Sequence, residues 1–236
     1  MPENIFKILG SYLCIIYVLI YLYMKIFYIC TYGGCGSKVL QKYLNNFGKT
    51  YHVHDPNPPI LLEGVGDNVI HKFKYQPNRT HNGFFNKKIV PSSELNNIFV
   101  IYIYRNPIKS IISRFTVQGN LEKNPKAHLE NIKGNPDITI NDVINTEKDL
   151  FNLEKFFDNY TTINEKRNYK IICIKYEELW NNIEELNKIL NIGNNISFPT
   201  RQERNINIGD DKKLKLEKIY LYLNKKMNNM KAIEIR

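Results

Sequence analysis

The chain has 236 residues, of which 43% are hydrophobic and 24% are charged. This composition supports a folded core and excludes a disordered tail, and the length fits one domain, with or without an anchor. The formal net charge of +10 is compatible with an anionic ligand, nucleic acid or an acidic membrane. Asn, Ile, Lys and Tyr are abundant, and their AT-rich codons offer a genomic explanation for part of this charge. The charge therefore does not choose among these partners.

Four cysteines are spread along the chain, at Cys14, Cys30, Cys35 and Cys173. They form no CxxC pair, and no His/Cys cluster has the spacing of a zinc site. We therefore expect neither a disulfide framework nor a metal.

An apolar run at the N-terminus, Ile8–Met24, carries no charged residue and is bracketed by Lys7 and Lys25. It approaches the roughly 20 residues that span a bilayer. We expect a hydrophobic helix in residues 1–24 that anchors a domain of residues 25–236 as a single-pass membrane protein. Two alternatives remain open: a start at Met24, which would give a cytoplasmic domain, or a buried N-terminal helix. The flanking charges leave membrane sidedness open.

The first half of the chain alternates predicted strands with turns and helices. Ile26–Thr31 predicts a strand, and the Gly-rich run Tyr32–Lys38 leads into a helix that should end near Gly48. His54–Pro59 predicts a loop, and Asn68–Tyr75 a second strand.

The clearest strand is Asn97–Tyr104, an unbroken apolar run typical of a strand buried on both faces. Pro107 suits the first turn of the helix that follows it. Further along we expect a polar surface insertion at Gly119–Asn141, a helix at Glu147–Tyr160, a strand at Tyr169–Lys175, a helix through Leu190 and a basic helix at Lys212–Arg236. This alternation predicts an α/β fold, a three-layer sandwich around a central parallel sheet.

The Gly-rich turn consists of Gly33, Gly34, Cys35, Gly36, Ser37 and Lys38. A turn from a buried strand into a helix directs backbone N–H groups at an anion, and the helix N-terminus adds partial positive charge. Ser37 adds a hydroxyl and Lys38 a full charge. The order Gly-Ser-Lys differs from the Walker order, which disfavours a magnesium–ATP hydrolase. A tight structural turn is the alternative.

A second candidate element joins Arg105, at the end of the clearest strand, to Ser113 in the next helix. Ligands of open α/β sheets bind outside the carboxyl ends of the strands. A guanidinium and a hydroxyl at that edge suit a phosphate group. The alternative is a surface arginine beside an ordinary helix serine.

These elements resemble the PAPS-dependent sulfotransferase superfamily, where PAPS is 3′-phosphoadenosine 5′-phosphosulfate. The resemblance covers Lys25 to Lys212 and implies a P-loop-like nucleotide-binding fold. The family's N-terminal loop binds the 5′-phosphosulfate, and Gly33–Lys38 occupies its place. The family's Arg-Asn-Pro run, with a Ser eight residues after the Arg, binds the 3′-phosphate. Arg105, Asn106, Pro107 and Ser113 match it without a gap.

Two further matches and two departures complete the resemblance. Tyr176-Glu177-Glu178-Leu179 resembles a Tyr-Glu-Asp-Leu run of the family, which implies that Tyr176 contacts the nucleotide. Arg204 keeps the spacing of the family's C-terminal Arg to a Gly-Asp pair, here Gly209-Asp210, which implies that Arg204 contacts the nucleotide, although the family's Lys-Gly after the Arg is missing. The family's loop lysine falls on Gly34, so we expect Lys38 to act on the sulfuryl oxygens from the helix start.

The family's catalytic base is a His, or a Glu in some carbohydrate-modifying members, near the second strand. His71, in VIHKFKY, is the candidate, and Glu63 and His54 compete with it.

The expected function is therefore sulfuryl transfer from PAPS to a hydroxyl or amine of an unidentified small molecule or carbohydrate, without a metal. A P-loop nucleotide kinase is the second interpretation, although its Walker Lys and magnesium-binding Asp are not evident. A third is a non-catalytic, membrane-tethered scaffold derived from a sulfotransferase, which the loss of the loop lysine favours. Nucleic-acid binding rests on charge alone, and we expect no nucleic-acid partner.

Overall fold

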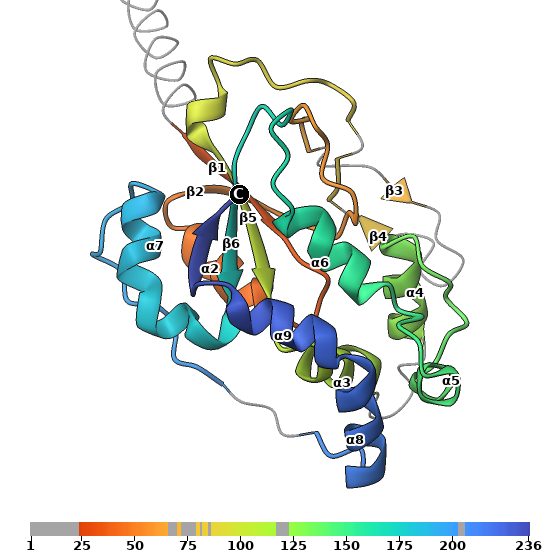
Figure 1. Cartoon of the computed structure of the whole chain (residues 1–236). Coiled ribbons are helices and arrows are strands. Elements are labelled where there is room, and N and C mark those ends of the chain that lie inside the picture. Colours follow the sequence, from red (N-terminus) through yellow and green to blue (C-terminus); the bar gives the residue numbers. More distant parts are fainter. Residues whose placement is uncertain are drawn as a thin grey trace, which may run out of the picture.

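The computed structural model (Figure 1) describes residues 24–65, 70–71, 79–80, 82–84, 86–116, 123–202 and 206–236. The expected N-terminal hydrophobic helix lies outside these ranges, apart from Met24. None of the helices within them has the length and hydropathy of a membrane span. The anchor therefore stays a prediction.

Within the described residues the main sheet has five strands, in the order β2-β1-β5-β6-β7. The strands are β1 (Lys25–Cys30), β2 (Gly48–Val53), β5 (Ile98–Tyr104), β6 (Ile171–Lys175) and β7 (Ile233–Ile235). β2, β1, β5 and β6 run parallel to their neighbours, whereas β7 pairs antiparallel with β6. The predicted mixed α/β class is confirmed, but the expectation of a parallel sheet fails at its β7 edge.

Helices pack on this sheet as Figure 1 shows. The α-helices are α2 (Ser37–Leu44), α3 (Pro107–Phe115), α4 (Lys123–Asn131), α5 (Ile140–Thr146), α6 (Leu153–Thr161), α7 (Ile183–Ile189), α8 (Asp210–Ile219) and α9 (Leu221–Asn229). Two 3₁₀ helices, η1 (Leu95–Asn97) and η2 (Tyr176–Asn182), adjoin β5 and β6. A separate antiparallel pair consists of β3 (Ile70–His71) and β4 (Arg79–Thr80).

Alternate residues of the central strands enter two different hydrophobic cores. In β1, Phe27 and Ile29 pack with α2 and α7, whereas Tyr28 and Cys30 pack with α6 and α9. Successive side chains of a strand point to opposite faces. Both faces of the sheet are therefore covered, which explains why the central strands are apolar without alternation.

The second strand in chain order is β2, which the sequence analysis did not predict. Of the strand predicted at Asn68–Tyr75 the structure describes Ile70 and His71, which do form a strand, β3, but in the separate sheet. Gly48 begins β2 instead of ending the preceding helix. A Cβ at Gly48 would lie 2.2 Å from the carbonyl oxygen of Lys25, so glycine allows β2 to approach β1 closely.

Three other predicted segments also differ from the structure. The predicted surface insertion contains α4, whose Ala127, His128 and Leu129 are buried. The helix predicted from Glu147 starts at Leu153, because Glu147 and Asn152 adopt left-handed backbone conformations. The predicted C-terminal helix is divided into α8, α9 and β7, because Ile233–Ile235 extends along β6.

Candidate functional site

The carboxyl ends of the parallel strands bring together the sequence segments that were singled out as functional. The Gly-rich loop follows β1, His54 follows β2, Arg105 follows β5 and Tyr176 follows β6. Because these strands run in the same direction, all four segments lie at the edge of the sheet formed by the carboxyl ends of its strands. This is the edge at which open α/β sheets bind ligands.

The Gly-rich loop has a backbone path that its glycines make possible. Gly33, Gly34 and Gly36 have φ angles of 119°, 70° and 72°. A Cβ would also lie 2.8 Å from Cε1 of His128 at Gly33 and 2.7 Å from the Ser110 carbonyl oxygen at Gly34. Backbone turns with left-handed residues form concave anion-binding sites, and this one opens onto the N-terminus of α2.

Cys35 fixes the loop to α3. Its Sγ lies 3.1 Å from the carbonyl oxygen of Gly33 and 3.5 Å from Oγ of Ser110. Burial raises the pKa of the Cys35 thiol, so the group stays neutral around pH 7. Cys35 therefore has a structural position in the loop and does not offer a thiolate to a ligand.

Ser37 and Lys38 begin α2 but lie in different environments. Ser37 is buried, and its Oγ lies 2.7 Å from Nε2 of His52, at the end of β2. Lys38 is exposed. The position of Lys38 in the first turn of α2 agrees with the sequence analysis, and its action on a sulfuryl group remains a prediction.

Arg105 connects β5 to the Gly-rich loop. Its Nη1 donates a hydrogen bond to the carbonyl oxygen of Gly34 at 3.1 Å, and its guanidinium carbon lies 4.8 Å from the centre of the Tyr176 ring. Its Nε is 4.0 Å from Oε1 of Glu177. Ser113 lies in α3, as predicted, and is half-buried. The structure therefore brings Arg105 to the Gly-rich loop. The expected joint binding of a 3′-phosphate by Arg105 and Ser113 stays a prediction.

Two residues that follow β6, Tyr176 and Glu177, contact the Gly-rich loop and the segment after β5. A Cβ at Gly36 would lie 2.1 Å from Cε2 of Tyr176, so the tyrosine ring packs against the glycine backbone. Glu177 Oε1 accepts a hydrogen bond from the backbone N–H of Asn106 at 3.1 Å. The Arg201 guanidinium lies 5.8 Å from the Tyr176 ring centre. Arg204, the residue implied by the resemblance, lies outside the described residues.

The candidates for the catalytic base are separated by the fold. His54 is buried, and its Nδ1–H donates to the carbonyl oxygen of Thr31 at 2.8 Å, directly before the loop. Glu63 follows Leu62, whose backbone N–H donates to Oδ1 of Asn168 at 2.8 Å. Asn168 precedes β6, so this contact places Glu63 near the amino-terminal edge of the sheet, opposite the Gly-rich loop. His71 belongs to β3, and the backbone alone does not test its predicted role.

Three residues that sequence reasoning missed also contact these segments. His52 carried no signal because β2 was not predicted. Ser110 was one polar residue in an amphipathic helix. Only its contacts with Gly34 and Cys35 in the folded chain identify it as part of the site. Glu177 lay inside a recognised run, but its contact with the segment after β5 depends on the packing of β6 beside β5.

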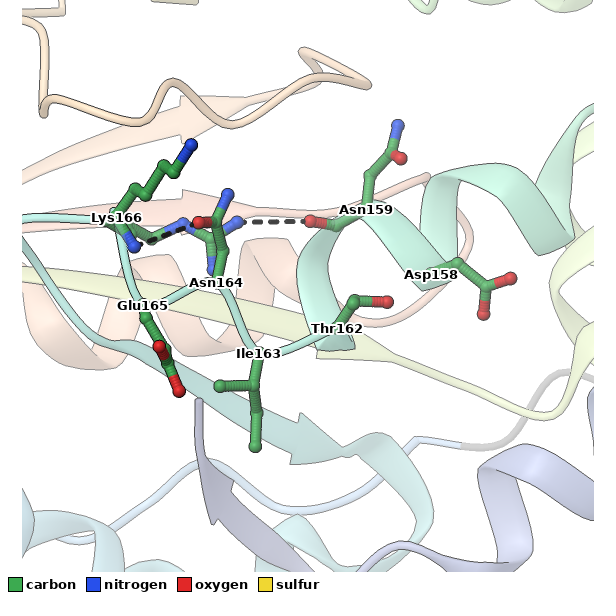
Figure 2. A pocket seen from close by; sticks show the side chains of 8 residues that line it. Asp158, Asn159, Thr162, Ile163, Asn164, Glu165 and Lys166 are labelled. Carbon is green, nitrogen blue, oxygen red and sulfur yellow. Dashed lines mark hydrogen bonds between the residues drawn. The ribbon is translucent and has the colours of Figure 1, made fainter.

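A pocket of about 490 Å³ lies away from this site. Figure 2 shows its lining at the end of α6 and in the following segment, including Asp158, Thr162 and Lys166. This segment precedes β6, so the pocket lies at the amino edge of the sheet, opposite the Gly-rich loop. Within the residues described, no group of His, Cys, Asp and Glu side chains is suited to hold a metal ion.

The comparison with known families agrees with these features. A family model described as a sulfotransferase domain matches residues 25–192, which is more than half of the chain. No curated protein and no solved structure matches the chain significantly. The matched range begins with β1 and includes the Gly-rich loop, Arg105 and Tyr176, and the predicted resemblance is confirmed. The chain belongs to the sulfotransferase domain family.

Proposed function

We propose that the chain transfers a sulfuryl group from PAPS to a hydroxyl or amine of an acceptor. The observation that carries this proposal is the hydrogen bond between Arg105 and Gly34. It joins the Gly-rich loop, which the resemblance assigns to the 5′-phosphosulfate, to the arginine that it assigns to the 3′-phosphate. A ligand with anionic groups at both its 5′ and 3′ positions would use both elements at once.

The residues present suit such a donor. The loop has positive φ angles at Gly33, Gly34 and Gly36, and side chains at these positions would collide with their neighbours. The backbone is therefore the surface that the loop offers to a 5′-phosphosulfate. The first N–H groups of α2 have no intrahelical acceptor, and they add donors at the same point. The Arg105 guanidinium suits the 3′-phosphate, because it can form two parallel hydrogen bonds.

The chemistry that PAPS supplies is an activated sulfuryl group with 3′,5′-ADP as its leaving group. The chain has to hold the donor in line with the acceptor and to stabilise the charge that develops on the moving oxygens. The loop backbone, Ser37 and the N-terminus of α2 would hold the 5′ side, and Arg105 with Ser113 the 3′ side. Lys38 would act on the sulfuryl oxygens, and Tyr176 would contact the nucleotide.

Removal of a proton from the acceptor completes the transfer. A base within hydrogen-bond reach of the acceptor hydroxyl or amine takes this proton as the new bond to sulfur forms. His71 remains the proposed base. Glu63 is a weaker candidate because it lies near the opposite edge of the sheet. His54 is a weaker candidate because its Nδ1–H is engaged with the Thr31 carbonyl.

A pocket of about 390 Å³ offers a place for the acceptor. It is lined by Phe115, Pro125, Lys126, Pro136, Asp137, Ile138, Thr139 and Ile140. The Phe115 ring lies 6.0 Å from the His128 ring, and His128 in turn packs against Gly33. The pocket is therefore linked through His128 to the loop that would hold the phosphosulfate. Its apolar wall and its Lys126–Asp137 ion pair suit a small molecule or carbohydrate that carries both apolar and polar groups.

One observation favours a non-catalytic scaffold as the second candidate. The family's loop lysine is replaced by Gly34, whose Cβ position is occupied by the Ser110 carbonyl. No side chain at that position can reach a sulfuryl group. Turnover would then depend on Lys38, which lies four residues after Gly34 in the first turn of α2.

Thermal stabilisation of the full chain by 3′,5′-ADP, compared with ATP plus magnesium, tests the donor assignment. Selective stabilisation by 3′,5′-ADP is expected, and selective stabilisation by ATP plus magnesium would favour a kinase. Transfer of radiolabelled sulfate from PAPS to a panel of hydroxyl and amine acceptors then tests turnover. Donor binding without transfer to any class in the panel would favour the scaffold.

A further inference from the structure

Ser37 and His52 form a close pair beside the proposed donor site. The Oγ of Ser37 lies 2.7 Å from Nε2 of His52, and the serine is buried whereas the histidine is half-buried. Ser37 is the first residue of α2, and His52 is near the carboxyl end of β2. The pair therefore connects the start of the loop helix to the edge strand of the sheet.

The direction of the hydrogen bond decides what Ser37 can offer to a ligand. A serine hydroxyl has one proton and two lone pairs. When Ser37 donates its proton to His52 Nε2, its lone pairs remain, and these repel the oxygens of a phosphate. When His52 carries the proton on Nε2 and donates it to Ser37, the serine proton is free to bond a phosphate oxygen.

We propose that His52 is a positioning residue for the donor, which turns the Ser37 hydroxyl towards the 5′-phosphate by donating from Nε2. The inference rests on the proposed function insofar as the anion at Ser37 is the 5′-phosphosulfate of PAPS. Binding of the anion selects the form of His52 that is protonated on Nε2, and this form strengthens the anion site. The two residues therefore act as one unit in donor binding.

The surroundings of His52 fit this role. The His54 ring centre lies 4.5 Å from that of His52 in an edge-on arrangement, so His54 limits the rotation of the His52 ring. His54 is itself held by its hydrogen bond to the Thr31 carbonyl. The imidazole at position 52 is therefore held at a fixed orientation relative to Ser37, as a positioning residue requires.

A double-mutant cycle on the full chain tests the coupling. Calorimetric titration with 3′,5′-ADP is expected to show about fivefold weaker binding for Ser37→Ala, from the loss of one hydrogen bond. His52→Ala is expected to weaken binding by a similar factor, and the double variant no further than either single one. His52→Gln should recover part of the affinity, because its side chain amide can donate to Ser37.

Thr50→Ala is the matched control, because Thr50 lies two residues before His52 on the same strand and its hydroxyl bonds to Asn45, away from the loop. It should leave the affinity unchanged. Additive losses for Ser37→Ala and His52→Ala would overturn the proposal.

Nitrogen-15 NMR of the histidine rings measures the protonation of His52 Nε2, which ligand binding would leave unchanged if the role of His52 were only structural. On addition of 3′,5′-ADP, the Nε2 resonance of His52 should shift to the position of a protonated nitrogen in the wild type but not in Ser37→Ala. An Nε2 that stays unprotonated in the complex would overturn the proposal even if the His52→Ala variant failed to fold.

Inorganic pyrophosphate serves as a second probe and separates the two proposals. Equal binding of pyrophosphate and 3′,5′-ADP, with coupling between Ser37 and His52 intact, would support the role of His52 and reject PAPS as the donor. Selective binding of 3′,5′-ADP with no response of His52 would reject the role of His52 alone. Binding of neither probe would overturn both.

Discussion

The ring of Tyr176 lies against the backbone of Gly36, at a distance that leaves no room for a side chain at position 36. A Cβ there would be 2.1 Å from Cε2 of the ring. Gly36 is the residue that precedes α2, whereas Tyr176 begins η2 after β6. The shape of the Gly-rich loop thus depends on a residue that lies 140 positions later in the chain.

Gly36→Ala should lower the free energy of unfolding by more than the backbone cost alone. A φ of 72° costs an alanine about 1–2 kcal/mol, and the collision with Tyr176 adds to this cost. Urea denaturation measures the loss. Combining Gly36→Ala with Tyr176→Leu should recover part of it, because a smaller side chain at position 176 relieves the collision but not the backbone cost. A double variant that recovers nothing would contradict the steric argument.

Arg105→Ala should weaken the binding of 3′,5′-ADP by roughly 2–4 kcal/mol, the cost of breaking a largely desolvated charge pair. The loss for 5′-AMP, which lacks the 3′-phosphate, should be smaller but not zero, because Arg105 also holds the carbonyl of Gly34. Arg105→Lys should recover only part, since a point charge does not replace the planar fork. Calorimetric titration at one salt concentration measures all of these.

Arg167→Ala is the control for Arg105, because Arg167 lines the pocket at the opposite edge of the sheet. It should leave both affinities unchanged. Equal losses for 3′,5′-ADP and 5′-AMP in Arg105→Ala would limit Arg105 to a role in holding the loop. No loss for either ligand would remove the main support for a 3′-phosphate site.

Lys38→Ala should lower the rate of sulfate transfer more than the affinity for 3′,5′-ADP. A charge on the sulfuryl oxygens matters most in the transition state, and 3′,5′-ADP lacks the sulfuryl group. Lys42→Ala is the matched control, because Lys42 is an exposed lysine one turn further along α2. The measurement is kcat and KM for PAPS in each variant. Unchanged turnover in Lys38→Ala would remove this lysine from the mechanism.

A chain that starts at Met24 should fold and keep its affinity for 3′,5′-ADP. The main sheet begins at Lys25, whose Nζ donates to the carbonyl oxygen of Leu190 at 2.9 Å and thereby ties the start of β1 to the end of α7. This interaction is retained when residues 1–23 are removed. Solubility, thermal unfolding and calorimetric titration provide the check. An insoluble or unfolded product would show that residues 1–23 belong to the core and are not a separate anchor.

The sequence by itself determined the elements whose signals are local. β1, β5 and β6 are unbroken apolar runs, because both of their faces are buried. Pro107 and the Asn106 cap, whose side chain accepts from the backbone N–H of Lys109, define the start of α3. The positions of Gly33–Lys38 and Arg105 at strand ends followed from these signals, and so did the family.

The tertiary structure alone decided which segments form the two outermost strands of the sheet. β2 and β7 were both missed, and both have a neighbour on one side only. β2 reads GKTYHV, with Lys49 exposed and Thr50 and His52 half-buried, so it lacks the apolar run that identifies a central strand. β7 has three residues and gains its place by pairing with β6. Pairing between distant segments, and not local preference, makes these residues strands.

The same distinction holds for the candidate site. Sequence reasoning found the residues that sit directly after apolar strands, since the direction of a strand places its carboxyl end. It did not find His52 beside Ser37, Ser110 beneath Gly34, or Glu177 at the backbone of Asn106. Ser37 and His52 lie on consecutive elements, α2 and β2, whereas the other two contacts join residues more than 70 positions apart. All three form only when β2, β1, β5 and β6 assemble in this order in the sheet, which brings the ends of separate strands close together.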